Sequence, residues 1–466
     1  MNDINDRKHT EGGIDYDRRN LIRRGCSVVG CWSIPSNGEV VRNPYEFSTN
    51  SAISLRQMKV FILTVGLCLL YLRDPIWRRR KVSGTDAFTG VWLVSDSILL
   101  FNPEAWQFLT WLGVGCILLT HAMFAVGKCI GAVKWIKSSF KRARRISEQQ
   151  PYHAFSNILL FYAILPFAIF GVIGTFISTG GFTPLIDGSI AEMRHYLLAS
   201  ELRIPVLYRL CANLIYPSLL IGTFAATRSP KWRHWGRFIA IPMLCSLLYS
   251  LSMGGKGCLI ISASIVIWTI LLNKGVRAAR RPFLIILGAV VCFSAFITYT
   301  RPDADGAIAT LNIYVYGPLV AMPQYLAEHL TIEWYNGGFE NLAIVREISN
   351  ALGATYSRSI DLTTVNIPMP YNMFTCIPEW LGAFGILGTV FLVFFIGVVS
   401  GFVDSQDHLK YVMLRVVVYV YLGFLLFADL SFLMVGWWIC LLFALLTVFS
   451  SKFIITRRPS LSHPLF

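Results

Sequence analysis

Several stretches of about 17 to 25 residues contain almost no charged side chain, and they restrict the possible folds more than any other feature. A helix of that length spans the ~30 Å hydrocarbon core of a bilayer. With 55% apolar and only 14% charged residues, the chain has more apolar surface than a soluble protein of 466 residues can bury. The sequence therefore predicts an all-α, polytopic membrane protein and excludes soluble enzymes.

The apolar stretches predict a transmembrane helical bundle of about eleven spans. Their expected ranges are 58–73, 86–103, 106–127, 152–178, 205–227, 237–252, 258–273, 282–300, 379–402, 411–428 and 431–451. Four regions follow from these spans. They are a polar, basic N-terminal tail (1–57), a first set of transmembrane helices (58–300), a large loop (301–378), and C-terminal helices with a cytoplasmic tail (379–466).

The net charge of +15 resides mainly on alternate connections between the spans. One set of connections carries 23 Lys or Arg residues and the other carries six. The basic set comprises Arg78–Lys81, Lys128–Arg145, Arg228–Arg237, Lys274–Arg281, Lys410 and Lys452–Arg458. By the positive-inside rule this set faces the cytoplasm, which places the C-terminus inside. We interpret the basic runs as solvated faces beside anionic lipid, and we expect no nucleic-acid partner.

Residues 1–57 fit this orientation poorly. The alternation of spans would place them outside, although they carry eight Lys or Arg residues and lack the apolar segment of a signal peptide. We expect this tail to be disordered or absent from the physiological protein, which would then begin at Met58; the remaining alternative is that the first span re-enters the membrane.

Two loops on the opposite side of the membrane are long enough to carry a functional site. The first, about 179–204, has apolar residues at helical spacing and is predicted to form a short interfacial helix that presents Arg194 and His195. The second, 301–378, contains an apolar segment, 307–330, that is interrupted by a glycine and two prolines. We expect that segment to dip into the membrane or to lie at its surface.

Basic residues at the outer ends of the spans indicate an anion-binding pocket. Lys256 lies in a glycine-rich turn, whose backbone N–H groups can approach an anion. Arg209 lies about one turn inside a span, where a charge requires either a partner or a water-filled cavity. Arg301 closes the outer end of another span. Together with Arg194 or Arg203, these residues predict a concave site that suits a lipid-linked diphosphate.

Each of these cations also has a purely structural explanation. Lys256 could be a snorkelling lysine at a plain turn, and Arg301 could anchor its helix at the membrane interface. Arg209 could form an ion pair with an acidic residue of the large loop. Metal-dependent phosphate chemistry would be expected to show close pairs of acidic residues, and the only candidates are Asp303 and Asp305. We therefore expect no metal and no other cofactor.

Four stretches resemble the Wzy-type polymerases of O-antigen and oligosaccharide repeat units. They are the glycine-rich turn Ser252–Leu259, the aromatic segment Asn312–Pro323, the segment Tyr371–Thr375 with its Asn-x-x-Thr pattern, and Glu379–Gly388 with its Glu-x-x-x-x-Phe-Gly pattern. The order of the spans and the large late loop also agree, so the resemblance covers about 58–455. Ala383 departs from the family pattern, because many relatives place Asp or Asn before Phe-Gly. An Asp at this position is therefore not available as a catalytic residue in this chain.

The resemblance implies an inner-membrane glycosyltransferase. It would transfer a glycan from undecaprenyl diphosphate to the terminal sugar of a new lipid-linked repeat unit on the periplasmic side. It also implies a GT-C-like architecture with a membrane-embedded base, an outer lid and no metal. The expected partners are undecaprenyl-diphosphate-linked glycans, the lipid bilayer and a chain-length regulator protein.

Glycosyl transfer needs a base for the acceptor hydroxyl and cations for the leaving diphosphate. We expect Glu379 to be the base, with His195 as the second candidate. The structural alternatives are a carboxylate at a helix start and an exposed histidine. The residues suited to stacking on sugars, or alternatively to anchoring the chain at the interface, are Tyr314, Tyr316, Trp334, Tyr335 and Tyr371, with Asn372 beside them.

Three other functions fit the same topology. An O-antigen ligase uses the same donor with a lipid A core acceptor, and the sequence separates it poorly from a polymerase. A lipid-linked oligosaccharide flippase or transporter would also carry intramembrane cations, but such proteins generally show repeated halves and short loops, which are not seen here. A structural scaffold would leave Arg209 unexplained.

Overall fold

The computed structural model describes residues 45–73, 82–147, 154–186, 204–228, 236–254, 256–299, 307–328, 334, 338–352, 365–366, 370–371, 375–406 and 411–455. The chain divides into two compact units, 1–51 and 52–466. The second unit contains the predicted spans and the large loop, and the description that follows concerns it.

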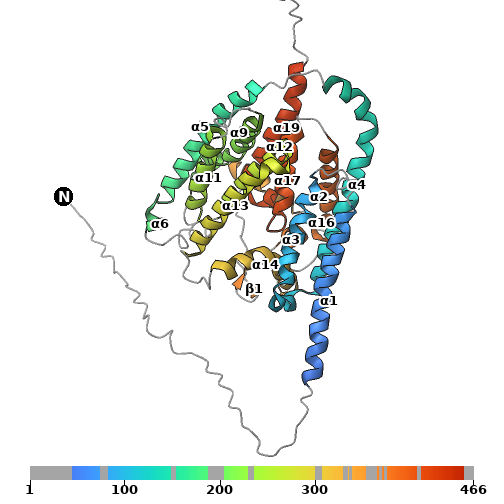
Figure 1. Ribbon diagram of the computed structural model, residues 1–466. Helices are drawn as coiled ribbons and strands as arrows, with labels where there is room; N and C mark the ends of the chain where they lie inside the picture. Colours follow the sequence, from blue (N-terminus) through green and yellow to red (C-terminus); the bar gives the residue numbers. More distant parts are fainter. Residues whose placement is uncertain are drawn as a thin grey trace, which may run out of the picture. The chain divides into compact units, whose positions relative to one another are not determined.

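Helices form nearly all of the described chain (Figure 1). The longer ones are α1 (Tyr45–Leu72), α3 (Thr89–Leu100), α4 (Trp111–Ser147), α5 (Ala154–Ser178), α9 (Ile215–Arg228), α11 (Ile241–Ser252), α12 (Gly257–Lys274), α13 (Val276–Tyr299), α14 (Ala307–Glu328), α16 (Cys376–Ser405), α17 (Val412–Phe424) and α19 (Val435–Ile455). The shorter ones are α2 (Gly84–Ala87), α6 (Thr183–Ile186), α8 (Val206–Ala212), α15 (Ala343–Ala351), α18 (Leu430–Leu433), the 3-10 helices η2 (Pro103–Phe108) and η4 (Phe339–Asn341), and the π-helical η3 (Gly236–Ala240). The strands β1 (Val365–Asn366) and β2 (Pro370–Tyr371) pair antiparallel in the large loop, which the sequence pattern does not predict.

Six helical stretches of the described chain are long and apolar enough to cross a membrane. They are Leu55–Leu72, Trp111–Val133, Ile158–Ser178, Val206–Arg228, Gly257–Lys274 and Cys376–Ser405. Three shorter apolar stretches are Gly236–Ser252, Val412–Phe424 and Val435–Phe449. All nine coincide with predicted spans, so the prediction of a helical membrane protein is confirmed.

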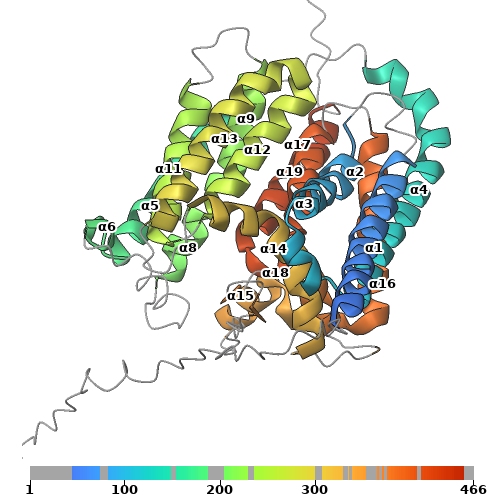
Figure 2. The same cartoon turned by 60° about the horizontal axis from the view of Figure 1, so that its bottom comes forward.

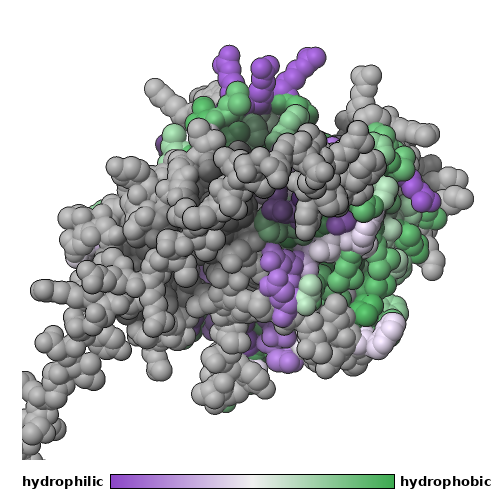
Figure 3. All heavy atoms as spheres, turned by 90° about the horizontal axis from the view of Figure 1, so that it is seen from below, coloured by the Kyte–Doolittle hydropathy of each residue, from purple (hydrophilic) through white to green (hydrophobic). Residues whose placement is uncertain are grey.

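The outer surface of the bundle has the apolar character that lipid requires. Phe61 on α1, Ile285 on α13 and Phe391 on α16 are each largely exposed. Hydrophobic side chains gather on the flank where Figure 2 places α1, α4 and α16, and Figure 3 shows this flank on its right-hand side. In water such a surface would promote aggregation, whereas in a bilayer it contacts the apolar lipid chains.

Two predicted elements differ in detail from the sequence prediction. The stretch 86–103, expected as one span, is divided by Phe88 into α2 and α3 and continues into η2. The apolar segment of the large loop forms the single helix α14, which runs through Pro318 and Pro323. Its middle is fully buried, since Leu319 and Met322 have no exposed surface, and Ser95 on α3 donates a hydrogen bond to a carbonyl oxygen of this helix.

α4 and α16 pack backbone against backbone. Each contributes two glycines four residues apart, Gly127 and Gly131 on α4 and Gly397 and Gly401 on α16. A Cβ at any of these positions would overlap a backbone carbonyl oxygen of the facing helix. Small residues at this spacing allow close helix approach in membranes, where van der Waals contact takes the place of the hydrophobic effect.

An ion pair between Lys128 and Asp404 lies inside this helix pair. Lys128 Nζ is 3.0 Å from Asp404 Oδ2, and the two side chains are 6% and 1% exposed. Lys128 also donates to Thr85, and the backbone N–H of Gly84 donates to Asp404, so the pair holds α2 in place beside α4 and α16 (Figure 2). The interpretation of Lys128 as the start of a solvated basic run is therefore wrong, because its charge is buried and neutralised.

Basic residues gather at one end of the bundle, where α9 and α12 end and α13 begins. Arg228, at the end of α9, donates to Asn273 beside Lys274 at the end of α12. Three arginines follow in the first turns of α13, all within 277–281. The other end of α12, at Gly257, is about 26 Å away by the 1.5 Å helical rise per residue.

Candidate functional site

A cavity of about 320 Å³ opens at the end of the bundle opposite the basic cluster. Its wall is formed by α8, the ends of α11 and α12, α15 from the large loop, and the segment from Phe424 to Val435 that joins α17 to α19. Most lining residues are apolar, and the polar lining includes Arg209, Asn213, Arg346 and Glu347. A few polar groups in an apolar cavity of this size are typical of a small-molecule site.

Arg209 reaches the cavity from α8, seven residues that start directly after Pro205. Its Nη1 is 3.7 Å from Glu347 Oε1, and the two side chains are 42% and 23% exposed. That separation is too long for a hydrogen bond, and partly exposed ion pairs stabilise a fold by only about 0–1 kcal/mol. The buried Nε of Arg209 has no hydrogen-bond partner among the described residues. The guanidinium thus faces an acidic residue of the large loop, as expected if Arg209 forms a structural ion pair. It nevertheless retains hydrogen-bonding capacity.

Arg346 is a cavity residue that was not among the predicted site residues. It lies on α15, and its Nη2 donates to the carbonyl oxygen of Phe432 on α18 at 3.4 Å. This contact joins the large loop to the membrane-spanning part of the chain. Among the described lining residues, Arg209 and Arg346 against Glu347 give the cavity a net positive charge. The available signal was that Arg346 is one of the six basic residues on the outer connections.

Lys256 directly precedes the cavity-lining residue Gly257 in the chain and is not itself among the lining residues. It immediately precedes α12, is half-buried, and is flanked in the chain by the lining residues Met253 and Gly257. The turn before it contains Gly254 with φ +55°, a conformation that favours glycine. The structure therefore brings the predicted residues Arg209 and Lys256 to the same end of the bundle, at adjoining elements.

Glu379, the predicted base, lies in the first turn of α16. Thr375 caps this helix, its Oγ1 accepting a hydrogen bond from the backbone N–H of Ile377 at 3.3 Å. Glu379 Oε2 accepts a hydrogen bond from the backbone N–H of Asp429 at 3.0 Å. Glu379 is not among the cavity-lining residues, although Asp429 directly precedes the lining residue Leu430. Its carboxylate is thus fixed next to the cavity wall.

Asp429 forms the centre of a buried polar cluster beside Glu379. It has no exposed surface, and it accepts hydrogen bonds from Trp380 Nε1 at 2.5 Å, Tyr421 OH at 3.0 Å and the backbone N–H of Ser431 at 2.7 Å. Burial raises the pKa of Asp429 above its ordinary value, although these donors act in the opposite direction. The cluster fixes the connection between α17 and α18, which forms part of the cavity wall.

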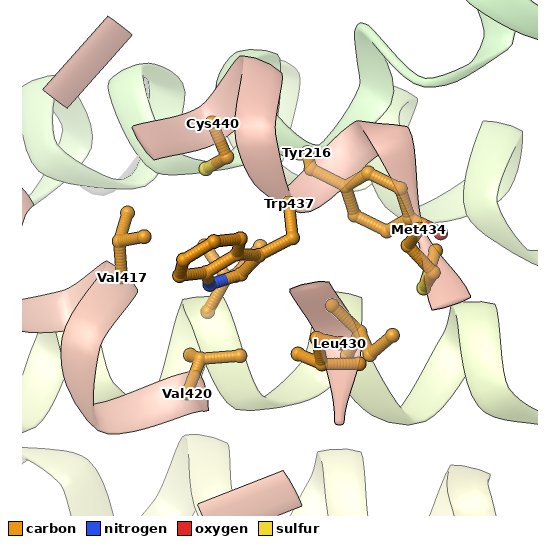
Figure 4. Close-up of a pocket in the computed structure, with 9 residues that line it drawn as sticks. Tyr216, Val417, Val420, Leu430, Met434, Trp437 and Cys440 are labelled. Atoms are coloured by element: carbon orange, nitrogen blue, oxygen red, sulfur yellow. The ribbon is translucent and has the colours of Figure 1, made fainter. Parts of the chain in front are cut away.

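A second, much smaller void lies against the cavity and shares Ile261, Leu430 and Met434 with it (Figure 4). Its volume is about 10 Å³, and apolar side chains surround it, among them Trp437. A void of about this size holds at most one water molecule. It is therefore a small packing void next to the cavity, with no room for a ligand.

The remaining predicted site residues have different outcomes. Those that lie outside the described residues are Arg194, His195, Arg203, Arg301, Tyr335 and Asn372. Tyr314 and Tyr371 fall in α14 and β2, but their side chains are outside the described part. Tyr316 is 5% exposed and packs in the core, so its ring is not presented to a sugar, whereas Trp334 is 72% exposed.

Among the described residues, the cavity lining combines two positively charged side chains with one negatively charged side chain. The guanidinium groups of Arg209 and Arg346 reach one concave space, and a guanidinium group can bind an oxyanion through two parallel hydrogen bonds. Comparison of the chain with protein-family models, with curated proteins and with solved structures gives no match.

Proposed function

We propose that this chain is an inner-membrane glycosyltransferase that polymerises undecaprenyl-diphosphate-linked oligosaccharide repeat units. The observation that carries the proposal is the joint presence of Arg209 and Arg346 in one 320 Å³ cavity. A cavity of that size accommodates a diphosphate with an attached sugar, while the prenyl chain and the rest of the glycan lie outside it. The resemblance of the sequence to Wzy-type polymerases supports the same assignment.

The proposal includes an orientation and an architecture. The basic cluster at Lys274–Arg281 faces the cytoplasm, so the cavity at the other end of α12 faces the periplasm. The chain crosses the inner membrane eleven times in a GT-C-like arrangement. In this arrangement, α15 of the large loop covers the cavity from outside.

The proposed reaction joins two lipid-linked glycans. The acceptor hydroxyl oxygen attacks the anomeric carbon of the donor sugar, and the bond from that carbon to the diphosphate oxygen breaks. The electron pair of this bond leaves on the diphosphate, where Arg209 and Arg346, with Lys256 and Arg301, stabilise the charge. The hydroxyl proton passes to Glu379, with His195 as the second candidate. The anionic leaving group is already attached to the donor, so no nucleotide sugar is required.

The test uses cells that lack the chromosomal gene and carry plasmid-borne variants. Arg209→Ala and Arg346→Ala are each expected to abolish long-chain polymer and to leave single repeat units on the lipid core. Lys256→Ala and Arg301→Ala are expected to give the same result. Glu340→Gln is the matched control, because Glu340 is exposed on η4 of the same loop and does not line the cavity.

The gel pattern separates this function from its alternatives. Loss of a ligase would leave the core without any repeat unit, and loss of a flippase would leave repeat units on the cytoplasmic side. An unchanged ladder of chain lengths in Arg209→Ala and Arg346→Ala cells, with wild-type protein levels, would rule out the pocket assignment.

A further inference from the structure

The cavity contains a negative charge opposite its positive ones. Among the described residues that line it, Glu347 is the one carboxylate. It lies on α15 next to Arg346 in sequence and faces Arg209 at 3.7 Å without a hydrogen bond. The two side chains are 42% and 23% exposed, and a partly exposed pair at this distance contributes little to the stability of the fold. The arrangement places a neutralising charge beside Arg209 without engaging its N–H donors in a hydrogen bond to Glu347.

An anion bound to Arg209 must compete with this carboxylate. Whether Glu347 stays in place and repels the anion, or turns away and loses its own partner, it lowers the affinity of the site. Lowered affinity has a benefit in a transferase. The spent lipid diphosphate carries more negative charge than the diester substrate and would otherwise remain on the arginines. If the diphosphate stayed bound in this way, its release would limit the rate of turnover.

We propose that Glu347 is an exchangeable counter-anion that promotes release of the spent diphosphate from Arg209. This inference rests on the proposed function, because it concerns the leaving group of that reaction. α15 is positioned for the exchange, since the hydrogen bond from Arg346 to Phe432 holds the helix on α18 while the Glu347 side chain remains 23% exposed. The carboxylate can therefore turn without unfolding its helix.

The binding experiment uses the full chain in nanodiscs of phosphatidylcholine, with inorganic pyrophosphate and undecaprenyl diphosphate as probes. Glu347→Gln is expected to tighten the binding of both probes about tenfold, or about 1.4 kcal/mol. Glu340→Gln is expected to bind like the wild type. The double variant Arg209→Ala/Glu347→Gln is expected to lose the gain, because the arginine is the group for which the two anions compete.

A kinetic readout distinguishes product release from a structural role. With saturating lipid-linked donor, Glu347→Gln is expected to lower kcat and KM together, because product dissociates more slowly. If Glu347 only stabilises the fold, the variant will unfold more readily and bind both probes with unchanged or weaker affinity, which overturns the inference. Tight binding of undecaprenyl diphosphate but not of pyrophosphate would assign recognition to the prenyl chain, and it would also overturn the role of Glu347.

The same measurements separate this inference from the proposed function. If the wild type binds neither probe, both proposals fail. If the wild type binds both probes and Arg209→Ala does not, but Glu347→Gln binds no more tightly than the wild type, only the counter-anion role fails. Replacing phosphatidylcholine by phosphatidylglycerol tests the lipid headgroup as the anion. A loss of pyrophosphate binding in that lipid alone would assign the site to headgroups and contradict both proposals.

Discussion

Lys128 and Asp404 are joined by a buried ion pair, with 3.0 Å between Nζ and Oδ2, across an interface that also contains four glycines. The glycines bring the backbones of α4 and α16 together, and the ion pair lies where α2 meets both helices. This end of the bundle is therefore fixed by direct helix contact and by charge. The cavity lies at the other end, where α15 of the large loop, α8 and the start of α12 line it.

Removing one member of the buried pair should destabilise the protein strongly. Lys128→Met leaves Asp404 charged and unpaired, which is expected to lower the free energy of unfolding by about 3–5 kcal/mol. The double variant Lys128→Met/Asp404→Asn removes both charges and keeps an oxygen for the N–H of Gly84, so it should recover most of the loss. Unfolding in detergent, followed by circular dichroism, measures both. Equal stability of the single variant and the wild type would contradict a buried charged pair.

The close approach of α4 and α16 can be tested with a single methyl group. Gly401→Ala places a Cβ against the carbonyl oxygen of Lys128, and backbone atoms cannot turn aside, so about 1–3 kcal/mol of destabilisation is expected. Gly115→Ala is the matched control on α4, because nothing lies within 4 Å of its Cβ position. That control should be neutral or slightly stabilising, since Ala favours helix more than Gly does. Identical melting temperatures for the two variants would refute the close packing.

The variant Glu379→Gln tests whether Glu379 acts as the catalytic base or only holds the fold through its hydrogen bond. The amide oxygen of Gln can still accept the hydrogen bond from the N–H of Asp429, so the fold should keep its stability. If Glu379 takes the acceptor proton, polymerisation should fall by about 10²–10⁴-fold. The measurement is the rate of polymer formation by purified variant with lipid-linked repeat units. Full activity would transfer the role of base to His195.

The buried carboxyl of Asp429 predicts a pH dependence of stability. Its pKa is raised in the folded state, so folding favours the protonated form. The stabilising contribution is complete below the ordinary carboxyl pKa of about 4 and is lost as the pH rises through the raised pKa. Asp429→Asn is expected to remove this part of the pH dependence while keeping most hydrogen bonds. A variant whose stability changes with pH as the wild type does would show that Asp429 does not titrate in this range.

The helices were predictable because uncharged apolar length is a local property. Each expected span from 58–73 to 431–451 contains helix in the structure. The break at Phe88 was not predictable, because α2 is held by Asp404, more than 300 residues away in sequence. For the same reason, the burial of Lys128 could not be distinguished from the solvated lysines that follow it.

The candidate site was predictable only in part. A charge inside an apolar span, as at Arg209, requires a partner or a cavity, and the structure supplies both. The identity of that partner, Glu347, depends on how the large loop folds back over the bundle, which no local pattern reveals. Arg346 was missed for the same reason, since it is an ordinary loop arginine until α15 packs on α18.

The most direct test of the account is a map of the full chain in nanodiscs with bound undecaprenyl diphosphate. We expect phosphate density in the 320 Å³ cavity, within hydrogen-bonding distance of the Arg209 and Arg346 guanidinium groups, with the Glu347 carboxylate turned away. Phosphate density beside the Lys274–Arg281 cluster, with the cavity empty, would contradict it.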